Sequence, residues 1–274
     1  MMCSFSRFWS ASWGLCGVAM LLTFSVPTQA ATPLKGRALV ITAPCLSKLH
    51  ITTSDTLSGA VLIDQPLPHG ISATVGQDGT ITVAQNGCTA TAPLTTGLTI
   101  TTRPDLPLTI AEAGRSAVLL DDRTGTVFIR AGSGPVEMGK AGELGLVSAS
   151  TGPLTIRTLS DSARIRSEKA APVTIRKITA PAIALYLGGS ATFDGQAGHL
   201  QALEITSDST GDAVMHGETD VGVFHIMSSG NIIVDKVGDT LATQRDGSGK
   251  IIPDAAAPPS PARSTHVTVI PASQ

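Results

Sequence analysis

Apolar and polar residues alternate in short runs along most of the chain. Runs such as Gly125–Ile129, Gly152–Ile156 and Ala171–Ile175 begin at a glycine or small residue and then place apolar side chains at alternate positions. Alternation with period two is typical of β-strands that bury one face. From about residue 96 to 240, successive runs mostly begin 8 to 11 residues apart. The pattern predicts many short strands and no long helix.

The regular spacing favours a β-solenoid. Each run carries only two or three inward apolar side chains, which are too few to form a core alone, but stacked runs bury a continuous stripe. Inward alanines such as Ala163, Ala191 and Ala213 suit a narrow core. We therefore predict an all-β, single-stranded β-solenoid (β-helix) with short strands every 8–11 residues. A β-sandwich, which also has strands at this spacing, is the alternative.

The two ends of the repeat region differ from its middle. Residues 31–95 are a strand-rich opening, in which Asp78 and Gly79 separate two β-type runs and predict a hairpin. Residues 96–240 carry the solenoid repeats. Residues 241–274, rich in proline and alanine, are predicted to be a C-terminal tail. Within that tail, His266–Ile270 is expected either to pair as a final strand or to be disordered.

Residues 1–30 predict an export signal. A single charge, Arg7, precedes the apolar run Gly14–Val26, and the small residue Ala30 follows it. This run has 13 residues, whereas a membrane-spanning helix needs about 20. We expect cleavage after Ala30, with residues 31–274 in the periplasm or on the cell surface of a bacterium and no transmembrane segment in that part. An uncleaved anchor is the alternative.

The cysteines agree with export. Once residues 1–30 are removed, only Cys45 and Cys88 remain, and two cysteines outside the cytosol usually pair. We predict a disulfide between them, which would tie the opening strands. Two free buried thiols are the alternative.

Charge and aromatic content narrow the function classes. Lys and Arg total 19 and Asp and Glu total 21, so a strongly basic nucleic-acid binder is excluded and no nucleic-acid partner is expected. The aromatic residues after position 30 are few: Phe128, Tyr186, Phe193 and Phe224. We expect most of these rings to point inward. A sugar-cleaving cleft usually offers aromatic platforms, so this expectation argues against one.

Outward arginines are the first candidate site. Four of them follow the last apolar residue of a predicted strand: Arg130, Arg157, Arg166 and Arg176. Arg164 and Lys177 add to this cluster, and Arg157, Arg166 and Arg176 are the predicted ligand-binding residues. On stacked coils they would form a basic ladder for carboxylate or phosphate polymers. The alternative is an ordinary solvated face, offset by Asp161 and Glu168.

Acidic and histidine side chains are further candidates. The acidic residues of the C-terminal half are Asp194, Glu204, Asp208, Asp212, Glu218 and Asp220. A polysaccharide lyase or hydrolase would need two or three of them in one groove, whereas the alternative is solvated turns. Met215, His216 and His225 suggest a metal site, but their spacing matches no ligand motif. We expect no catalytic residue, no metal and no cofactor.

Two repeats resemble those of a known family. Ala131–Met138 and Ser228–Val234 are similar to the (G/S)SG(D/N)-hydrophobic repeats of the DUF2807 family, described as an adhesin "head GIN" domain, and Gln77–Val83 resembles its hairpin. The resemblance implies an exported β-solenoid of the envelope. We expect a non-enzymatic, adhesin-like binding or scaffolding module whose partner is an envelope glycan or envelope protein. A polysaccharide-active lyase or hydrolase on a β-helix scaffold is the alternative.

Overall fold

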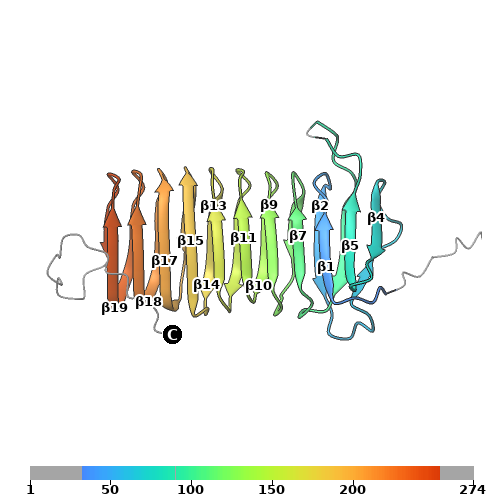
Figure 1. Cartoon of the computed structure of the whole chain (residues 1–274), viewed down its shortest axis with the longest axis horizontal. Helices are drawn as coiled ribbons and strands as arrows, with labels where there is room; N and C mark the ends of the chain where they lie inside the picture. Colours follow the sequence, from blue (N-terminus) through green and yellow to red (C-terminus); the bar gives the residue numbers. More distant parts are fainter. Residues whose placement is uncertain (1–32, 90, 254–274) are drawn as a thin grey trace, which may run out of the picture. The chain divides into compact units, whose positions relative to one another are not determined.

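The computed structural model describes residues 33–89 and 91–253, which fold as a β-solenoid (Figure 1). Every regular element among them is a strand. None of these residues belongs to a helix long and apolar enough to cross a membrane. The predicted export signal, residues 1–30, and the segment His266–Ile270 lie outside the described residues.

The strands form two faces, which we call sheet I and sheet II. In spatial order, sheet I consists of β3 (Val61–Ile63), β6 (Leu98–Thr102), β2 (Lys48–Thr53), β8 (Ala117–Leu120), β10 (Val136–Ala141), β12 (Leu154–Leu159), β14 (Pro172–Ile178), β16 (Thr192–Gly195), the first parts of β18 (Ala213–Ile226) and β19 (Ile232–Arg245), and β20 (Ile251–Pro253). Sheet II consists of β4 (Ile71–Val75), β5 (Thr80–Gln85), β1 (Ala38–Thr42), β7 (Leu108–Glu112), β9 (Val127–Ala131), β11 (Leu144–Ser148), β13 (Ala163–Ser167), β15 (Ala182–Gly189), β17 (His199–Ser209), and the later parts of β18 and β19.

Each coil contributes one strand to each sheet. From β7 onward every strand pairs in parallel with the strand two positions later, or with part of a long strand that spans both sheets. Val136, Leu154, Val173 and Phe193 occupy equivalent positions in successive coils. Because each coil holds two strands, the predicted strand spacing corresponds to half a coil. The predicted β-solenoid is confirmed, and the sandwich alternative is wrong.

The N-terminal coils are stacked out of sequence order. Strand β1 lies between β5 and β7, and β2 lies between β6 and β8 (Figure 1). Beyond them, β4 pairs antiparallel with β5, and β3 pairs antiparallel with β6. The predicted hairpin at Asp78-Gly79 is confirmed as β4–β5, and Gly79 has a φ of 77°. A later segment of the chain therefore covers this end of the solenoid.

A buried arginine holds the connection that crosses the inserted coil. Residues 103–107 lead from β6 to β7, past the coil formed by β1 and β2. Arg123 is fully buried, and its guanidinium donates to Thr102 Oγ1 at 2.7 Å and to the Leu106 carbonyl at 2.5 Å. Burial lowers the pKa of Arg123 to about 10. The guanidinium still carries its charge at neutral pH and bridges the two ends of the crossing segment.

The core is narrow and mostly aliphatic, because inward positions of both sheets alternate with outward ones. The rings of Phe193 and Phe224 are buried inside, as predicted. Phe128 and Tyr186 are not inward. Their neighbours Val127 and Leu185 point inward and are buried, so the next residue on each strand, Phe128 or Tyr186, lies on the outer face of sheet II. Where several consecutive residues are apolar, the sequence does not show which of them point inward.

Corner glycines are required by close stacking of successive coils. A Cβ at Gly230 would lie 2.1 Å from the Gly211 carbonyl oxygen, and one at Gly249 would lie 2.1 Å from the Gly230 oxygen. No real side chain fits at those distances. The glycine of the Ser228–Val234 repeat is therefore explained by backbone packing at the corner.

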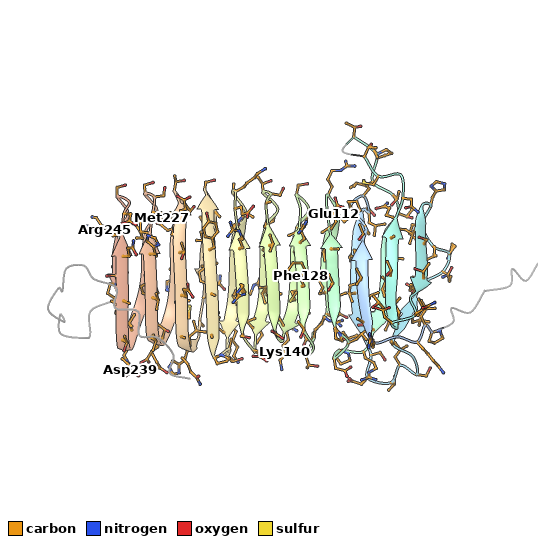
Figure 2. The ribbon with its side chains drawn as sticks, in the orientation of Figure 1. Glu112, Phe128, Lys140, Met227, Asp239 and Arg245 are labelled. Carbon is orange, nitrogen blue, oxygen red and sulfur yellow. A yellow bond between two sulfur atoms is a disulfide. The ribbon has the colours of Figure 1, made fainter. Side chains whose placement is uncertain are left out.

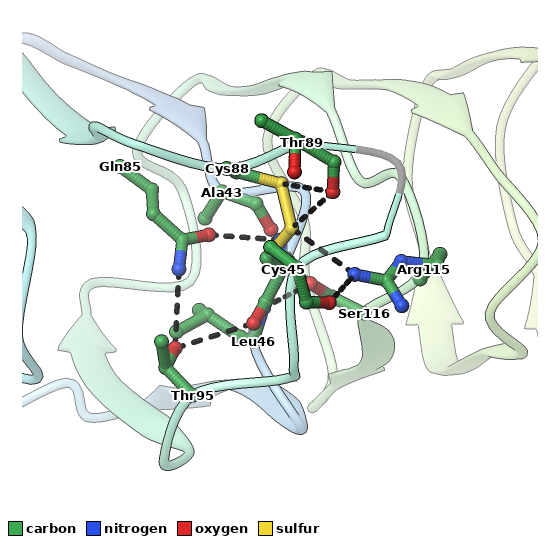
Figure 3. Close-up of a disulfide and its surroundings, with 10 residues drawn as sticks. Ala43, Cys45, Leu46, Gln85, Cys88, Thr89, Thr95, Arg115 and Ser116 are labelled. Carbon is green, nitrogen blue, oxygen red and sulfur yellow. Dashed lines mark hydrogen bonds between the residues drawn. A yellow bond between two sulfur atoms is a disulfide. The ribbon is translucent and has the colours of Figure 1, made fainter.

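The predicted disulfide between Cys45 and Cys88 is confirmed, with a Cα–Cα distance of 5.8 Å (Figure 3). The backbone N–H of Cys45 donates to Gln85 Oε1 at 2.8 Å, and Gln85 Nε2 donates to Thr95 Oγ1 at 3.1 Å. Thr95 Oγ1 in turn donates to the Cys45 carbonyl at 3.2 Å. The bond and this network join the corner after β1 to the loop after β5, in two coils that stack on each other.

The last coil becomes polar at its inward positions. β19 runs to Arg245 and β20 follows at Ile251–Pro253, so both enter the segment assigned above to the tail. Thr243 pairs with Phe224 and Arg245 pairs with Ile226, and both β19 residues are exposed. An inward-pointing charge at an edge strand opposes further pairing. The apolar core thus ends within the second part of β19.

Candidate binding surface

The three arginines singled out from the sequence lie on two different faces. Arg157 on β12 and Arg176 on β14 occupy adjacent rungs of sheet I, since Ile156 pairs with Ile175. Arg166 is on β13 in sheet II. Arg130 and Arg164 also lie on strands of sheet II. The structure brings Arg157 and Arg176 together and places Arg166 on the other sheet.

Arg157 and Arg176 border a depression of about 630 Å³ on sheet I. Its lining residues come from neighbouring coils and are Thr53, Leu119, Leu120, Asp121, Asp122, Glu137, Met138, Gly139, Thr155, Arg157 and Arg176. Gly139 keeps the depression open, because a Cβ there would lie 2.2 Å from Asp122 Oδ1 and 3.2 Å from Arg157 Nη2.

Asp122 fixes one of the two guanidinium groups. Its Oδ1 accepts a hydrogen bond from the Lys140 backbone N–H at 2.7 Å and another from Arg157 Nη2. The Lys140 N–H, and after it Arg157, hold the pKa of Asp122 below its usual value. The carboxylate is therefore ionised at neutral pH and orients Arg157. The side chain of Arg176 makes no hydrogen bond or ion pair within residues 33–89 and 91–253.

The depression also contains hydrogen-bond acceptors. Asp121 Oδ1 lies 3.3 Å from His50 Nε2. Glu137 on β10 is the neighbour of Thr155 on the next rung, β12. Adjacent rungs of a sheet are about 4.8 Å apart, so Arg157 and Arg176 place two like charges side by side, of which Asp122 pairs with Arg157. The arrangement can bind a carboxylate or phosphate at the arginines and accept hydroxyl hydrogen bonds at the acids.

Arg166 on sheet II already has two partners on its own chain. Its Nε donates to Glu168 Oε1 at 2.5 Å, and its guanidinium carbon lies 4.2 Å from the centre of the Tyr186 ring. This guanidinium is thus held against the sheet by an ion pair and a cation–π contact.

The acidic residues named as an alternative site are spread over several faces and turns. Asp194 lies on β16 in sheet I, whereas Glu204 lies on β17 in sheet II. Asp212 accepts hydrogen bonds from Asn231, Glu218 pairs with Lys236 at 2.7 Å, and Asp220 pairs with His199 at 2.7 Å. The structure does not gather them into one groove.

The histidines pair with aspartates of the next coil. His216 contacts Asp235 at 3.3 Å on sheet I, and His225 contacts Asp246 at 2.8 Å on sheet II, while Met215 is buried in the core. No group of three or more His, Cys, Asp or Glu within the described ranges is placed to hold a metal ion. In both pairs the two partners are separated in sequence by one coil, a periodicity that could have identified them from the sequence.

Comparison with solved structures finds the same fold in other proteins, including the following two. One is described as a putative adhesin (BF0245) from Bacteroides fragilis NCTC 9343, with 16% identity, a TM-score of 0.54, and coverage of 81% of this chain and 94% of that one. The other is described as a putative adhesin from Parabacteroides distasonis ATCC 8503, with 16% identity, a TM-score of 0.55, and coverage of 81% and 93%. No family model and no curated protein matches the chain. At this identity the likeness concerns the fold, and the resemblance to DUF2807 stays a prediction.

Proposed function

We propose that this protein is an exported, non-enzymatic, adhesin-like binding module of the bacterial envelope. Its ligand is a polymer that carries carboxylate or phosphate groups together with hydroxyls, and an acidic envelope glycan has this chemistry. The observation that carries the proposal is the depression on sheet I, where Arg157 and Arg176 occupy adjacent rungs. The adhesin descriptions of the two structures with the same fold are consistent with it.

The geometry supports binding along the flank. Anionic groups of the ligand accept hydrogen bonds from Arg157 and Arg176, and its hydroxyls donate to Asp121 and Glu137. A solenoid repeats its surface at each rung, so an extended polymer gains contacts over several coils. Arg166 lies on the other sheet and is not part of this site.

A binding screen tests the proposal. Purified protein is applied to an array of acidic and neutral envelope glycans beside the variant Arg157→Ala/Arg176→Ala. The matched control is Arg130→Ala/Arg166→Ala, which removes two arginines from sheet II. We expect binding to acidic glycans that weakens as salt is raised and that only the sheet I variant loses.

Soluble breakdown products are assayed in the same wells. Release of shortened glycan would overturn the non-enzymatic assignment in favour of a polysaccharide-active enzyme. Equal loss of binding in both double variants would overturn the assignment of the site to sheet I. If the protein bound no glycan on the array, the proposed ligand class would be wrong. Capture of binding partners from envelope extract would then test an envelope protein as the ligand.

A further inference from the structure

A second depression, of about 720 Å³, lies on the outer face of sheet II, away from the proposed ligand site. It extends from Phe128 on β9 to Val223 on β18. Its floor is made of small residues, among them Gly145, Ala184 and Ala202. The strands beneath it run side by side with little twist (Figure 1). Phe128 lies about half-way along the whole row of strands (Figure 2) and at one end of this depression. The small residues of the floor allow another layer of protein to approach the strands closely.

One row of outward residues follows this face from β9 to β19. In register, one per rung, these residues are Phe128, Gly145, Arg164, Ala184, Glu204, Val223 and Ala242. Ala184 on β15 is the central residue. Arg164 lies one rung to one side of it and Glu204 lies one rung to the other. Neither side chain makes a hydrogen bond or ion pair within the described part of the chain.

We infer that a second copy of this chain packs on this face as a symmetric dimer. A two-fold axis lying in the interface and parallel to β15 reverses the order of the rungs but keeps each residue's place along its strand. Arg164 then faces Glu204 of the partner subunit, and the same ion pair forms a second time by symmetry. Ala184 faces Ala184 of the partner subunit.

The side-chain sizes are complementary under the same operation. Phe128 faces Ala242 of the partner subunit, and Gly145 faces Val223 of the partner subunit. The Phe128 ring leans over Gly145, since a Cβ on that glycine would lie 2.9 Å from Phe128 Cδ2. Val223 is 44% exposed, so it has apolar surface to bury against that ring. Within this row each bulky residue therefore meets a small one and Arg164 meets Glu204 of the partner subunit, while Tyr186, two residues along β15 on the same face, lies on the axis and meets Tyr186 of the partner subunit.

The strip is of a suitable size for a dimer. Six steps of about 4.8 Å give a length of about 29 Å, and three outward residues per strand give a width of about 20 Å. The outline is on the order of 600 Å² on each partner, so the two copies together bury about 1,200 Å², at the lower end of the roughly 1,200–2,000 Å² that stable interfaces bury.

Dimerisation through sheet II is independent of the proposed function, but it would affect how the ligand sites are presented. Packing through sheet II leaves sheet I of both copies on the outside, with Arg157 and Arg176 facing away from the interface. The dimer would then present two ligand sites in opposite directions, an arrangement suited to bridging two ligand polymers.

Analytical ultracentrifugation of the full protein, as recovered from the expressing cell, tests the inference over about 1–100 µM. We expect a concentration-dependent dimer. Arg164→Glu and Glu204→Arg each place like charges face to face twice and should weaken the dimer at least about tenfold. The double variant Arg164→Glu/Glu204→Arg restores opposite charges across the interface and should restore the dimer. Arg176→Glu, on sheet I, is the matched control and should leave it unchanged.

Crosslinking tests the position of the axis independently of charge. Ala184→Cys should give a covalent dimer with a short bismaleimide, because the two cysteines meet at the axis. Thr174→Cys, on the outer face of sheet I, should not. All of these positions are on outer faces of strands, and circular dichroism confirms that each variant is folded. A monomer at every concentration, or a dimer that no charge change on sheet II alters, would overturn the inference.

Discussion

Replacing Arg123 with methionine tests how the out-of-order coils are held together. Methionine keeps much of the apolar volume but removes the hydrogen bonds that the guanidinium donates to Thr102 Oγ1 and to the carbonyls of Leu106 and Arg103. Hydrogen bonds that involve a charged group contribute about 1.5–3 kcal/mol each, and an unsatisfied buried carbonyl costs about 1–3 kcal/mol. Burial lowers the pKa of Arg123 from 12.5 to about 10, so the charge costs about 3 kcal/mol that the variant recovers. The balance predicts that Arg123→Met lowers the free energy of unfolding by about 3 kcal/mol.

Urea titration followed by far-ultraviolet circular dichroism measures this change, and native-state hydrogen exchange locates it. Amides of residues 102–107 should exchange faster in Arg123→Met, because that segment loses its anchor. Arg130→Met, at an exposed outward position, is the control and should change little. Replacing a buried charged group with an apolar one is sometimes neutral or stabilising. Equal stability and unchanged exchange in 102–107 would refute the anchoring role.

Three further predictions concern the covalent, electrostatic and backbone contacts between coils. Cys45→Ser/Cys88→Ser removes the disulfide and should lower the free energy of unfolding by about 4 kcal/mol, measured by urea titration under oxidising conditions; an unchanged midpoint would contradict this. The hydrogen bond and charge of Asp220 raise the pKa of His199. The His199–Asp220 pair therefore stabilises the folded protein fully below about pH 6.5, and this stabilisation is lost as pH rises through the raised pKa of the folded state. NMR titration should find the pKa of His199 raised, and His199→Gln should abolish this part of the pH dependence of stability. Gly230→Ala should cost about 1–3 kcal/mol, because its Cβ has no space against the preceding coil; a thermal midpoint equal to that of the unchanged protein would argue against close corner stacking.

The solenoid could be predicted because one physical pattern repeats. Alternate apolar residues, small inward alanines and corner glycines recur every half coil, and the structure has two strands in each coil. The out-of-order stacking of β1 and β2 could not be predicted in this way. Which strands neighbour each other depends on long-range pairing, and strands of similar pattern pair equally well. Arg123 was missed for the same reason, since its partners lie in a crossing segment that sequence spacing does not reveal.

The candidate site was predicted less well than the fold. Period-two alternation placed the arginines on outer faces, but it does not say to which sheet a strand belongs. Because consecutive strands alternate between sheets, Arg157 and Arg176 lie two strands apart and share a face, whereas Arg166 lies between them in sequence and on the other sheet. The step from Arg157 to Arg176 equals the one-coil step from Ile156 to Ile175, so the coil length, once known, places the two arginines side by side.

Protection of arginines by a bound glycan tests whether the ligand binds to sheet I. The protein is modified with phenylglyoxal with and without a saturating acidic glycan identified in the screen, and modification at each arginine is quantified by mass spectrometry. We expect that the ligand protects Arg157 and Arg176 on sheet I and leaves the modification of Arg130 and Arg164 on sheet II unchanged. Protection of the sheet II arginines, with Arg157 and Arg176 still reactive, would contradict it.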